Sequence, residues 1–289
     1  MLHCDRSSSA ASELPASIDS IVERLKPSGI VTLTTDFGLA DHYVGAMKGV
    51  ILATYPGVTI ADITHGVEPY QVEQGAFFLA QAYKTFPKGT VHVAVVDPGV
   101  GTARQCLTAR TGEHYFVAPD NGLLSHVAWD TPTKVHTVEF EQVIGTPMSR
   151  TFHGRDVFAP VGARIAMGED PTSWGILVED YVVLRSLEPE RRTSGRWRGR
   201  VLNVDRFGNL VTSLRPELVA ALEGDFLLRV GEAEITRLAE AYADIDDEEP
   251  FLVAGSAGYL EVSVRQGSAA EAVDAWLGDE VELEDNSLS

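Results

Sequence analysis

Between residues 29 and 176, short apolar runs alternate with segments in which apolar residues recur at helical spacing. The strand-like runs are rich in β-branched residues, end at Gly, Pro or Asp turns, and span residues 30–35, 58–63, 91–96 and 115–118. The helical segments span residues 42–55, 72–86 and 123–129, and Asp41 is the expected N-cap of the first. Strands that alternate with helices in this way predict an α/β fold with a largely parallel sheet and helices on both faces.

The pattern changes after an arginine-rich stretch at residues 191–200. From there on, short runs, several of them alternating, are separated by Gly and Asp turns, which is typical of a smaller antiparallel β barrel or sandwich. These runs span residues 199–204, 226–230, 234–236, 252–254 and 259–264. We therefore expect a flexible N-terminal extension over residues 1–28, an α/β domain over 29–187 and a C-terminal antiparallel β domain over 196–285.

Composition narrows the classes of partner. The net charge of −19 argues against binding of duplex nucleic acid, because its phosphates require Lys and Arg. The arginine-rich stretch is the exception, and we interpret it either as an interdomain connector lying against acidic surfaces or as a nucleic-acid patch. No apolar run approaches the roughly 18 residues that span a bilayer, and the polar N-terminus is not a secretory signal. The two cysteines, Cys4 and Cys106, cannot build a disulfide framework, which favours the reducing cytoplasm.

The most informative residue is Asp97, which ends the run at 91–96 and precedes Arg104 in the stretch V-V-D-P-G-V-G-T-A-R. The carboxyl end of a strand in a parallel sheet is where α/β folds bind ligands. Together with His153, from T-F-H-G-R-D, an acid, a guanidinium and an imidazole are able to hold and polarise a water molecule. The alternative is that Asp97 begins a Pro-Gly turn and pairs with Arg104 on the surface.

Other motifs support or exclude further chemistry. Asp36, Asp62 and the turn at residues 120–122 also follow predicted strands, so we expect them in the same crevice. The eight histidines are scattered without paired spacing, which gives a metal site little support. A P-loop, a complete dinucleotide fingerprint and a G-x-S-x-G elbow are all missing from the sequence, so neither nucleotide cofactors nor α/β-hydrolase chemistry is indicated.

Seven motifs in order resemble one family. They are T-T-D-F-G and D-x-Y-V-G-x-M-K-G at residues 34–49, D-P-G-V-G-T-x-R at 97–104, A-P-D-N-G-L-L at 118–124, T-F-H-G-R-D at 151–156, D-x-F-G-N at 205–209 and G-Y-L-E at 258–261. Together they resemble the S-adenosyl-L-methionine (SAM) hydroxide adenosyltransferases, which are adenosine-forming SAM hydrolases related to the SAM-dependent fluorinase and chlorinase. The resemblance covers about residues 29 to 284. It implies attack of an activated water on C5′ of SAM, release of adenosine and L-methionine, and a homotrimer with active sites between subunits.

The resemblance also implies roles for individual residues. Asp97, Arg104 and His153 would handle the water, and Asp36 would bind the ribose hydroxyls. The other substrate-binding residues implied are Asp41, Tyr43, Tyr70 and Phe152 in the first domain and Asp205, Asn209, Ser256, Glu261, Val264 and Gln266 in the second, the last two near adenine. The halogenating relatives differ, with Tyr in place of Asp97, and the fluorinase has Ser in place of Gly154 and Arg in place of Ala257.

Two other functions remain open in the sequence. One is a SAM-dependent halogenase, which an acid at position 97 opposes because a carboxylate repels a halide. The other is a nucleoside- or SAM-binding module without turnover, which would retain Asp36 but tolerate loss of Asp97, Arg104 or His153. All three residues are present, which favours catalysis. We expect SAM as the substrate, no metal or cofactor, and neither nucleic acid nor membrane as a partner.

Overall fold

The computed structural model describes residues 25–145, 149–185, 188–193, 195–222 and 225–285. Chain contacts divide the protein into two compact units, Met1–Val183 and Leu184–Ser289, whereas we expected the boundary near residues 187–195. Residues 1–24 of the predicted flexible extension lie outside the described residues. Leu25 and Ser28 belong to the folded N-terminal unit, because Leu25 packs on its core and the Ser28 amide donates to the Gly89 carbonyl at 3.0 Å.

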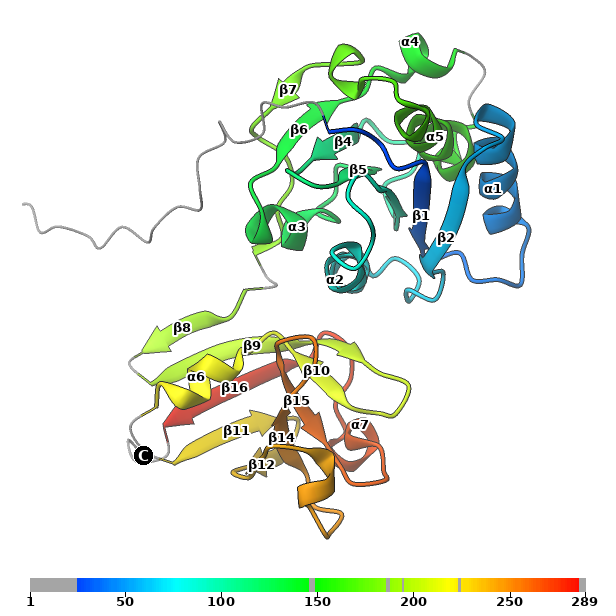
Figure 1. The fold of residues 1–289 in the computed structure, drawn as a ribbon. Coiled ribbons are helices and arrows are strands. Elements are labelled where there is room, and N and C mark those ends of the chain that lie inside the picture. The colour runs from blue at the N-terminus through cyan, green and yellow to red at the C-terminus, as the bar shows by residue number, and fades with distance from the viewer. Residues whose placement is uncertain (1–24, 146–148, 186–187, 194, 223–224, 286–289) are drawn as a thin grey trace, which may run out of the picture. The chain divides into compact units, whose positions relative to one another are not determined.

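The N-terminal unit is built on a seven-stranded sheet with the strand order β2-β1-β3-β5-β4-β6-β7 (Figure 1). The first four strands in this order are parallel, and the last three add antiparallel pairs. The strands are β1 (Ile30–Thr35), β2 (Thr59–Thr64), β3 (Val91–Val95), β4 (Cys106–Arg110), β5 (Tyr115–Pro119), β6 (Lys134–Thr137) and β7 (Leu177–Val178). The predicted, largely parallel sheet is confirmed, and β4, β6 and β7 are additions that the apolar pattern did not reveal.

Helices cover both faces of this sheet, as the alternation of elements predicts. The helix α1 (Tyr43–Thr54) packs with α5 (Ala159–Met167) on one face, and α2 (Val72–Tyr83) packs with α3 (Ser125–Asp130) on the other (Figure 1). A short α4 (Phe140–Ile144), a π-helix over Gly154–Phe158 and a 3₁₀ turn over Pro171–Ser173 complete the unit. The expected N-cap Asp41 is wrong: α1 is preceded by His42, and it has no side-chain cap hydrogen bond.

The core between the sheet and the α1–α5 layer follows the period-2 pattern of the strands. Val31 and Leu33 of β1 and Val91, Val93 and Val95 of β3 all point into this core and are at most 2% exposed. Burial of these adjacent parallel strands on both faces explains why they read as nearly continuous apolar runs in the sequence.

The C-terminal unit is a curled, mainly antiparallel nine-stranded sheet that forms a half-barrel, as the short alternating runs predict (Figure 1). The order is β12-β11-β16-β9-β10-β15-β14-β13, and β8 pairs with β9. Its strands are β8 (Glu190–Thr193), β9 (Arg196–Val204), β10 (Leu210–Thr212), β11 (Phe226–Val230), β12 (Ala233–Ile235), β13 (Leu238–Ala239), β14 (Phe251–Ala254), β15 (Leu260–Ser263) and β16 (Glu280–Asp285). Its helices are α6 (Pro216–Ala220), α7 (Ala269–Val273) and a 3₁₀ turn over Tyr242–Asp244.

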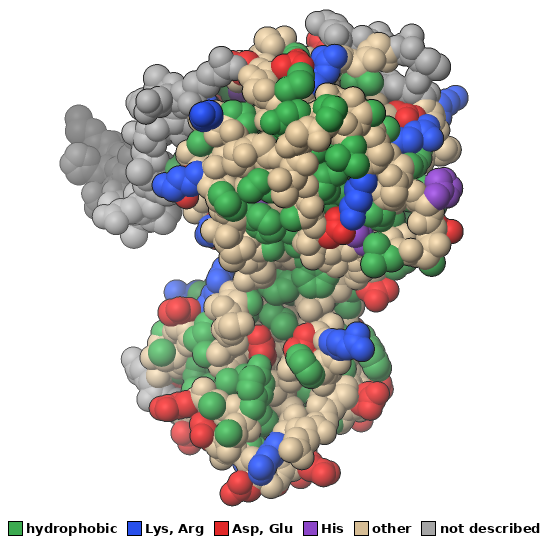
Figure 2. Space-filling model, turned by 45° about the vertical axis from the view of Figure 1, so that its right-hand side comes forward, with side chains coloured by type: hydrophobic (Ala, Val, Ile, Leu, Met, Phe, Trp, Pro, Cys, Tyr) green, Lys and Arg blue, Asp and Glu red, His purple; other side chains and the backbone are tan. Residues whose placement is uncertain are grey.

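The arginine-rich stretch forms strands of this sheet and is not a connector. Arg196 pairs with Glu284 of β16, and Nε of Arg198 lies 3.1 Å from a carboxylate oxygen of Glu280. Glu284 also pairs with Arg229 of β11. Figure 2 shows many acidic side chains on this unit, and Arg196 and Arg198 are matched to acids of the same sheet.

Within the described residues, the structure holds no helix that is both long enough and apolar enough to cross a membrane.

Two helix glycines make a matched test of this packing. A Cβ at Gly162 of α5 would lie 2.4 Å from Cγ2 of Val93, whereas a Cβ at Gly49 of α1 would meet no atom within 4 Å. We expect Gly162→Ala to destabilise the protein by about 1–3 kcal/mol through overpacking. Gly49→Ala should stabilise it by about 0.5–1 kcal/mol through helix propensity. Urea unfolding of both variants checks this, and shifts of the same sign would contradict it.

Candidate active site

Asp97 and Arg104 form a buried ion pair just beyond β3. Nε of Arg104 donates to both carboxylate oxygens of Asp97, each at 3.0 Å, and Nη2 donates to Oδ2 as well. The two side chains are only 5% and 9% exposed. The alternative of a surface ion pair at a Pro-Gly turn is therefore wrong. Removing one partner of such a pair leaves a buried charge without compensation, which typically costs about 3–5 kcal/mol.

His153 completes this network. Nη2 of Arg104 lies 2.7 Å from Nδ1 of His153. Because a guanidinium has donors and no acceptor, Nδ1 must accept this hydrogen bond, and the proton of the neutral ring lies on Nε2. Burial and the neighbouring Arg104 charge lower the pKa of His153, while Asp97 opposes them. The imidazole is thus held neutral with its Nε2–H available as a donor.

The loop that carries Asp97 and Arg104 is fixed at its start and in its middle. The side-chain amide of Asn121 donates to the Val96 carbonyl at 2.8 Å, directly before Asp97. Gly101 has a φ of +78°, and a Cβ there would lie 2.5 Å from the Arg150 carbonyl oxygen. Only glycine fits this close approach of two backbones.

A cavity of about 160 Å³ opens beside the network. Its wall includes three aromatic rings: the Tyr43 ring centroid lies 5.0 Å from that of Phe152 in an edge-to-face contact, and the Phe37 centroid lies 6.0 Å from that of Phe152. The cavity is lined by Phe37, Tyr43, Val95, Asp97, Val100, Thr151, Phe152, His153 and Gly154. A carboxylate and an imidazole thus face a mainly apolar space, where electrostatic interactions are strengthened by exclusion of water.

Asp36 lies beyond β1, at the same edge of the sheet. Its Oδ2 accepts from the Tyr70 amide at 3.0 Å, and Tyr70 has a left-handed φ of 69°. Burial raises the pKa of Asp36, and the Asp97 charge adds to this effect. Asp41 and Tyr70 are exposed, and neither is among the residues that line the cavity.

The segment after β1 is supported by a second hydrogen-bonded chain. Oγ1 of Thr35 lies 2.8 Å from Nδ1 of the buried His65 and accepts from the Phe37 amide at 3.2 Å. Asp62, expected in the crevice, lies 3.1 Å from Nε2 of His65 and also pairs with Lys48 at 2.6 Å. Asp62 therefore supports the segment that presents Asp36 and Phe37.

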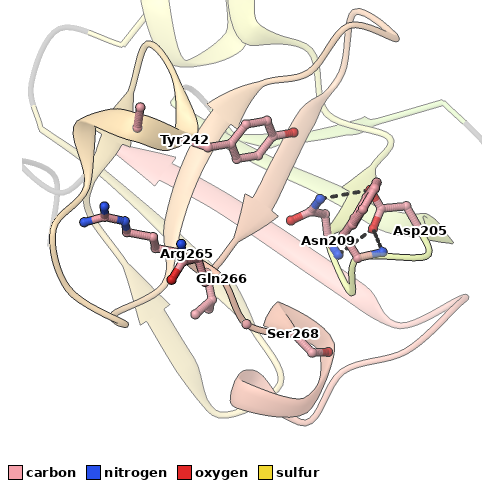
Figure 3. A pocket seen from close by; sticks show the side chains of 10 residues that line it. Asp205, Asn209, Tyr242, Arg265, Gln266 and Ser268 are labelled. Atoms are coloured by element: carbon pink, nitrogen blue, oxygen red, sulfur yellow. Dashed lines mark hydrogen bonds between the residues drawn. The ribbon is translucent and has the colours of Figure 1, made fainter.

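The C-terminal unit holds a second cavity, of about 900 Å³ (Figure 3). The turn between β9 and β10 brings Asp205 and Asn209 to its wall, and Figure 3 shows Arg265 and Gln266 on another side. Oδ1 of Asp205 accepts the amides of Phe207 and Asn209 at 2.8 and 2.9 Å, and Nδ2 of Asn209 donates to Oδ2 at 2.9 Å. Asp205 thus shapes the turn on which Asn209 is presented.

The remaining predicted residues of this unit take different places. Val264 and Gln266 line the cavity, whereas the exposed Ser256 lies in the turn between β14 and β15 and is not part of its lining. Oε2 of the buried Glu261 accepts from the Tyr242 hydroxyl at 2.7 Å. Burial raises the pKa of Glu261. Glu261 does not line the cavity itself, but its hydrogen bond orients Tyr242, which does.

Sequence reasoning missed several lining residues. Phe37 and Phe207 each stand in a turn between an Asp and a Gly, and Phe207 is 78% exposed. A large aromatic in such a turn is a signal for a binding wall, because it is not needed for the turn itself. The others missed are Val95, Val100, Thr151, Gly154, Tyr242, Ala243, Gly267 and Ser268.

Among the described residues, no three His, Cys, Asp or Glu side chains are placed to hold a metal ion. The features present are a buried charge network at a small apolar cavity and a larger cavity with polar and aromatic walls. They define an enzyme that acts on a small molecule.

The family follows from comparison with known proteins. The sequence model of the SAM hydroxide adenosyltransferase N-terminal domain matches residues 31–175, and that of the C-terminal domain matches residues 199–282. The chain belongs to the SAM hydroxide adenosyltransferase family.

Individual relatives agree with this assignment. The (R)-S-adenosyl-L-methionine hydrolase of Salinispora tropica is 37% identical over 262 residues, covering 90% of this chain and 99% of that protein. The crystal structure of an uncharacterized conserved protein from Thermotoga maritima has a TM-score of 0.78 and 38% identity, covering 88% of this chain and 99% of that one. A fluorinase of Actinoplanes is 29% identical over 212 residues, covering 64% of this chain and 71% of that protein.

The state of His153 can be tested by NMR. Because burial and Arg104 lower its pKa below the ordinary 6.5, we expect more than half of His153 to be neutral at pH 6.5, with the midpoint of its titration at lower pH. Long-range ¹H–¹⁵N spectra should show the Nε2–H tautomer. In Arg104→Gln the pKa should rise, since the repelling cation is gone while Asp97 remains. A proton on Nδ1, or a pKa that falls in the variant, would contradict the network described here.

Proposed function

We propose that this protein hydrolyses SAM to adenosine and L-methionine by direct attack of water on C5′. The observation that carries the proposal is the buried Asp97–Arg104–His153 network at the wall of an aromatic cavity. The names of the relatives supply the substrate and specify the (R) form at sulfur. No metal or cofactor takes part in the reaction, which we assign to the cytoplasm.

The reaction converts a cation and a neutral water into neutral products and one proton. The water oxygen bonds to C5′ as the C5′–S bond breaks, and the bonding electrons leave with the sulfur of methionine. Attack requires the water in line with that bond, within about 3–3.5 Å of C5′. Exclusion of water from the apolar cavity favours this step, because the positive charge of the sulfonium is dispersed as the bond breaks.

The hydrogen bonds of the network support one route for the proton that the water releases. Nδ1 of His153 is engaged with Arg104, and its Nε2 carries a hydrogen, so the neutral ring orients the water as a donor. Asp97 lines the cavity and is the acceptor for the proton that the water releases. Arg104 fixes the direction of the Asp97 carboxylate and engages part of its lone pairs, which opposes attack of the carboxylate itself on C5′.

The complete site is proposed to combine both cavities in a homotrimer. Asp36 would hold the ribose hydroxyls at the first cavity, with Asp41, Tyr43 and Tyr70 nearby. Asn209, Ser256, Val264 and Gln266 would hold the rest of the nucleoside in the C-terminal unit of a neighbouring subunit. Asp97 and His153 line the first cavity, whereas Asn209, Val264 and Gln266 line the second, and this separation of the residues motivates the pairing across subunits.

The halogenase alternative is disfavoured by charge. The carboxylate of Asp97 lines the small cavity in which a nucleophile would sit. An anion of the same sign is repelled there, since little water is present to screen the two charges. A module that only binds SAM would have no use for a buried Asp97–Arg104 pair, whose desolvation is unfavourable.

Incubation with each sulfur epimer of SAM in ¹⁸O water tests the reaction. Wild-type enzyme should give adenosine that carries ¹⁸O at the 5′ oxygen in a single turnover, with no 5′-chloro product in added chloride. Asp97→Asn should lower kcat by about 10²–10⁴-fold while calorimetry shows SAM binding retained. Absence of adenosine would overturn the proposal. Unlabelled adenosine in the first turnover would instead show a covalent aspartyl intermediate.

Subunit mixing tests the shared site. Asp97→Asn disables the first cavity, and Phe207→Arg places a cation in the second cavity at an exposed position that folding does not need. Each variant alone should be nearly inactive. Refolded equimolar mixtures should recover about a quarter of wild-type activity, because one in four sites of a random trimer pairs two intact halves. No recovery, or a monomer of full activity in sedimentation, would contradict the assignment.

A further inference from the structure

One nitrogen of the Arg104 guanidinium is left without a hydrogen bond. Arg104 uses Nε and Nη2 for Asp97 and His153, whereas its Nη1 is buried and has no hydrogen-bond partner among the described residues. Buried polar groups in native proteins nearly always have a partner, and each exception requires a physical explanation. The requirement is stronger here, because the donor belongs to a charged group. Nη1 is buried too deeply for a ligand in the cavity at Asp97 to reach it, so its partner lies within the fold.

The aromatic ring of Phe158 lies against this guanidinium. Cζ of Arg104 is 5.2 Å from the ring centroid, which is within the range of a cation–π interaction. Phe158 is completely buried in the core of the N-terminal unit, so the contact is shielded from water. Cation–π interactions are strongest when the two groups are desolvated in this way. The π face of Phe158 therefore takes the place of a further hydrogen-bond acceptor for the guanidinium.

A π turn brings Phe158 to the same cation as His153. The two residues are five positions apart, since His153 directly precedes the π-helix and Phe158 is its last residue. The Ala159 amide donates to the Gly154 carbonyl, five residues back, which is the hydrogen bond that defines a π-helix. In an α-helix, residues five apart point about 140° away from each other. Here the widened turn lets both side chains contact Arg104, and such turns are frequent at functional sites.

We propose that Phe158 is a positioning residue for the reaction and acts through a cation–π contact that orients the Arg104 guanidinium. The inference rests on the proposed function, because Arg104 holds the groups to which the attack of water is assigned. Hydrogen bonds to Asp97 and His153 fix the Nε and Nη2 side of the planar group, and the ring restrains the side that carries Nη1. Phe158 is not among the residues that line the cavity, so it acts on the reaction only through Arg104.

Replacement of Phe158 by mono-, di- and trifluorophenylalanine separates the electrostatic contact from packing. Each added fluorine withdraws electron density from the face of the ring and weakens its attraction for a cation, while the shape of the side chain changes little. The kcat of adenosine formation should therefore fall stepwise, by about 2–30-fold in total, which is the rate equivalent of one cation–π contact. The KM for SAM should change little. A kcat that is the same for all three analogues would overturn the proposal.

Phe158→Leu removes the ring, and Phe116→Leu is its matched control. Both phenylalanines are fully buried in the N-terminal unit, but Phe116 stacks on His92. Both variants should have a lower melting temperature, because each loses core packing. Only Phe158→Leu should lower kcat and raise the pKa of His153 in long-range ¹H–¹⁵N spectra, since a loosened Arg104 lowers that pKa less. An equal loss of kcat in the two variants, or an unchanged pKa of His153 in Phe158→Leu, would contradict the positioning role.

NMR of the substrate-free protein keeps this inference distinct from the proposed reaction. The ring current of Phe158 should shift the Nη1 hydrogens of Arg104 upfield, and the shift should vanish in Phe158→Leu but persist in Phe116→Leu. If wild-type protein forms adenosine and the shift is absent, only the role of Phe158 is overturned. If the shift is present and no adenosine forms, the contact stands and the proposed reaction is overturned, together with any role of the contact in it.

Discussion

The guanidinium of Arg104 is the group on which the active site depends. It donates to both oxygens of Asp97 and to Nδ1 of His153, and so fixes a carboxylate and an imidazole from two distant segments. These segments are the loop after β3 and the start of the π-helix before α5. The close packing of Gly162 against Val93 holds α5 against β3 and thereby maintains the geometry of the network. The same packing contact therefore contributes both to the stability of the core and to the geometry of the site.

Charge is used differently in the two units. In the C-terminal sheet, Arg198 and Arg229 meet Glu280 and Glu234 of neighbouring strands in exposed pairs, which contribute little stability individually. In the N-terminal unit, the Asp97–Arg104 pair is buried, and its surroundings make it strong and directional. An acidic surface therefore coexists with a site in which one cation determines the orientation of the reacting groups.

Local patterns in the sequence determined the elements that are long and apolar. The runs that became β1, β2, β3 and β5 and the helical periodicity of α1 and α2 were read correctly, because burial of a face imposes a period of 2 or 3.6 on the chain. The position of Asp97 after a strand, and its grouping with Arg104 and His153, also followed from sequence. The sequence patterns did not reveal the short β4, β6 and β7, the glycine- and alanine-rich α5 or the pairing of the arginine stretch with β16. These features depend on contacts with distant residues. The same holds for Nδ1 of His153 as a hydrogen-bond acceptor: a sequence specifies which groups exist, and only the folded chain decides which of them meet.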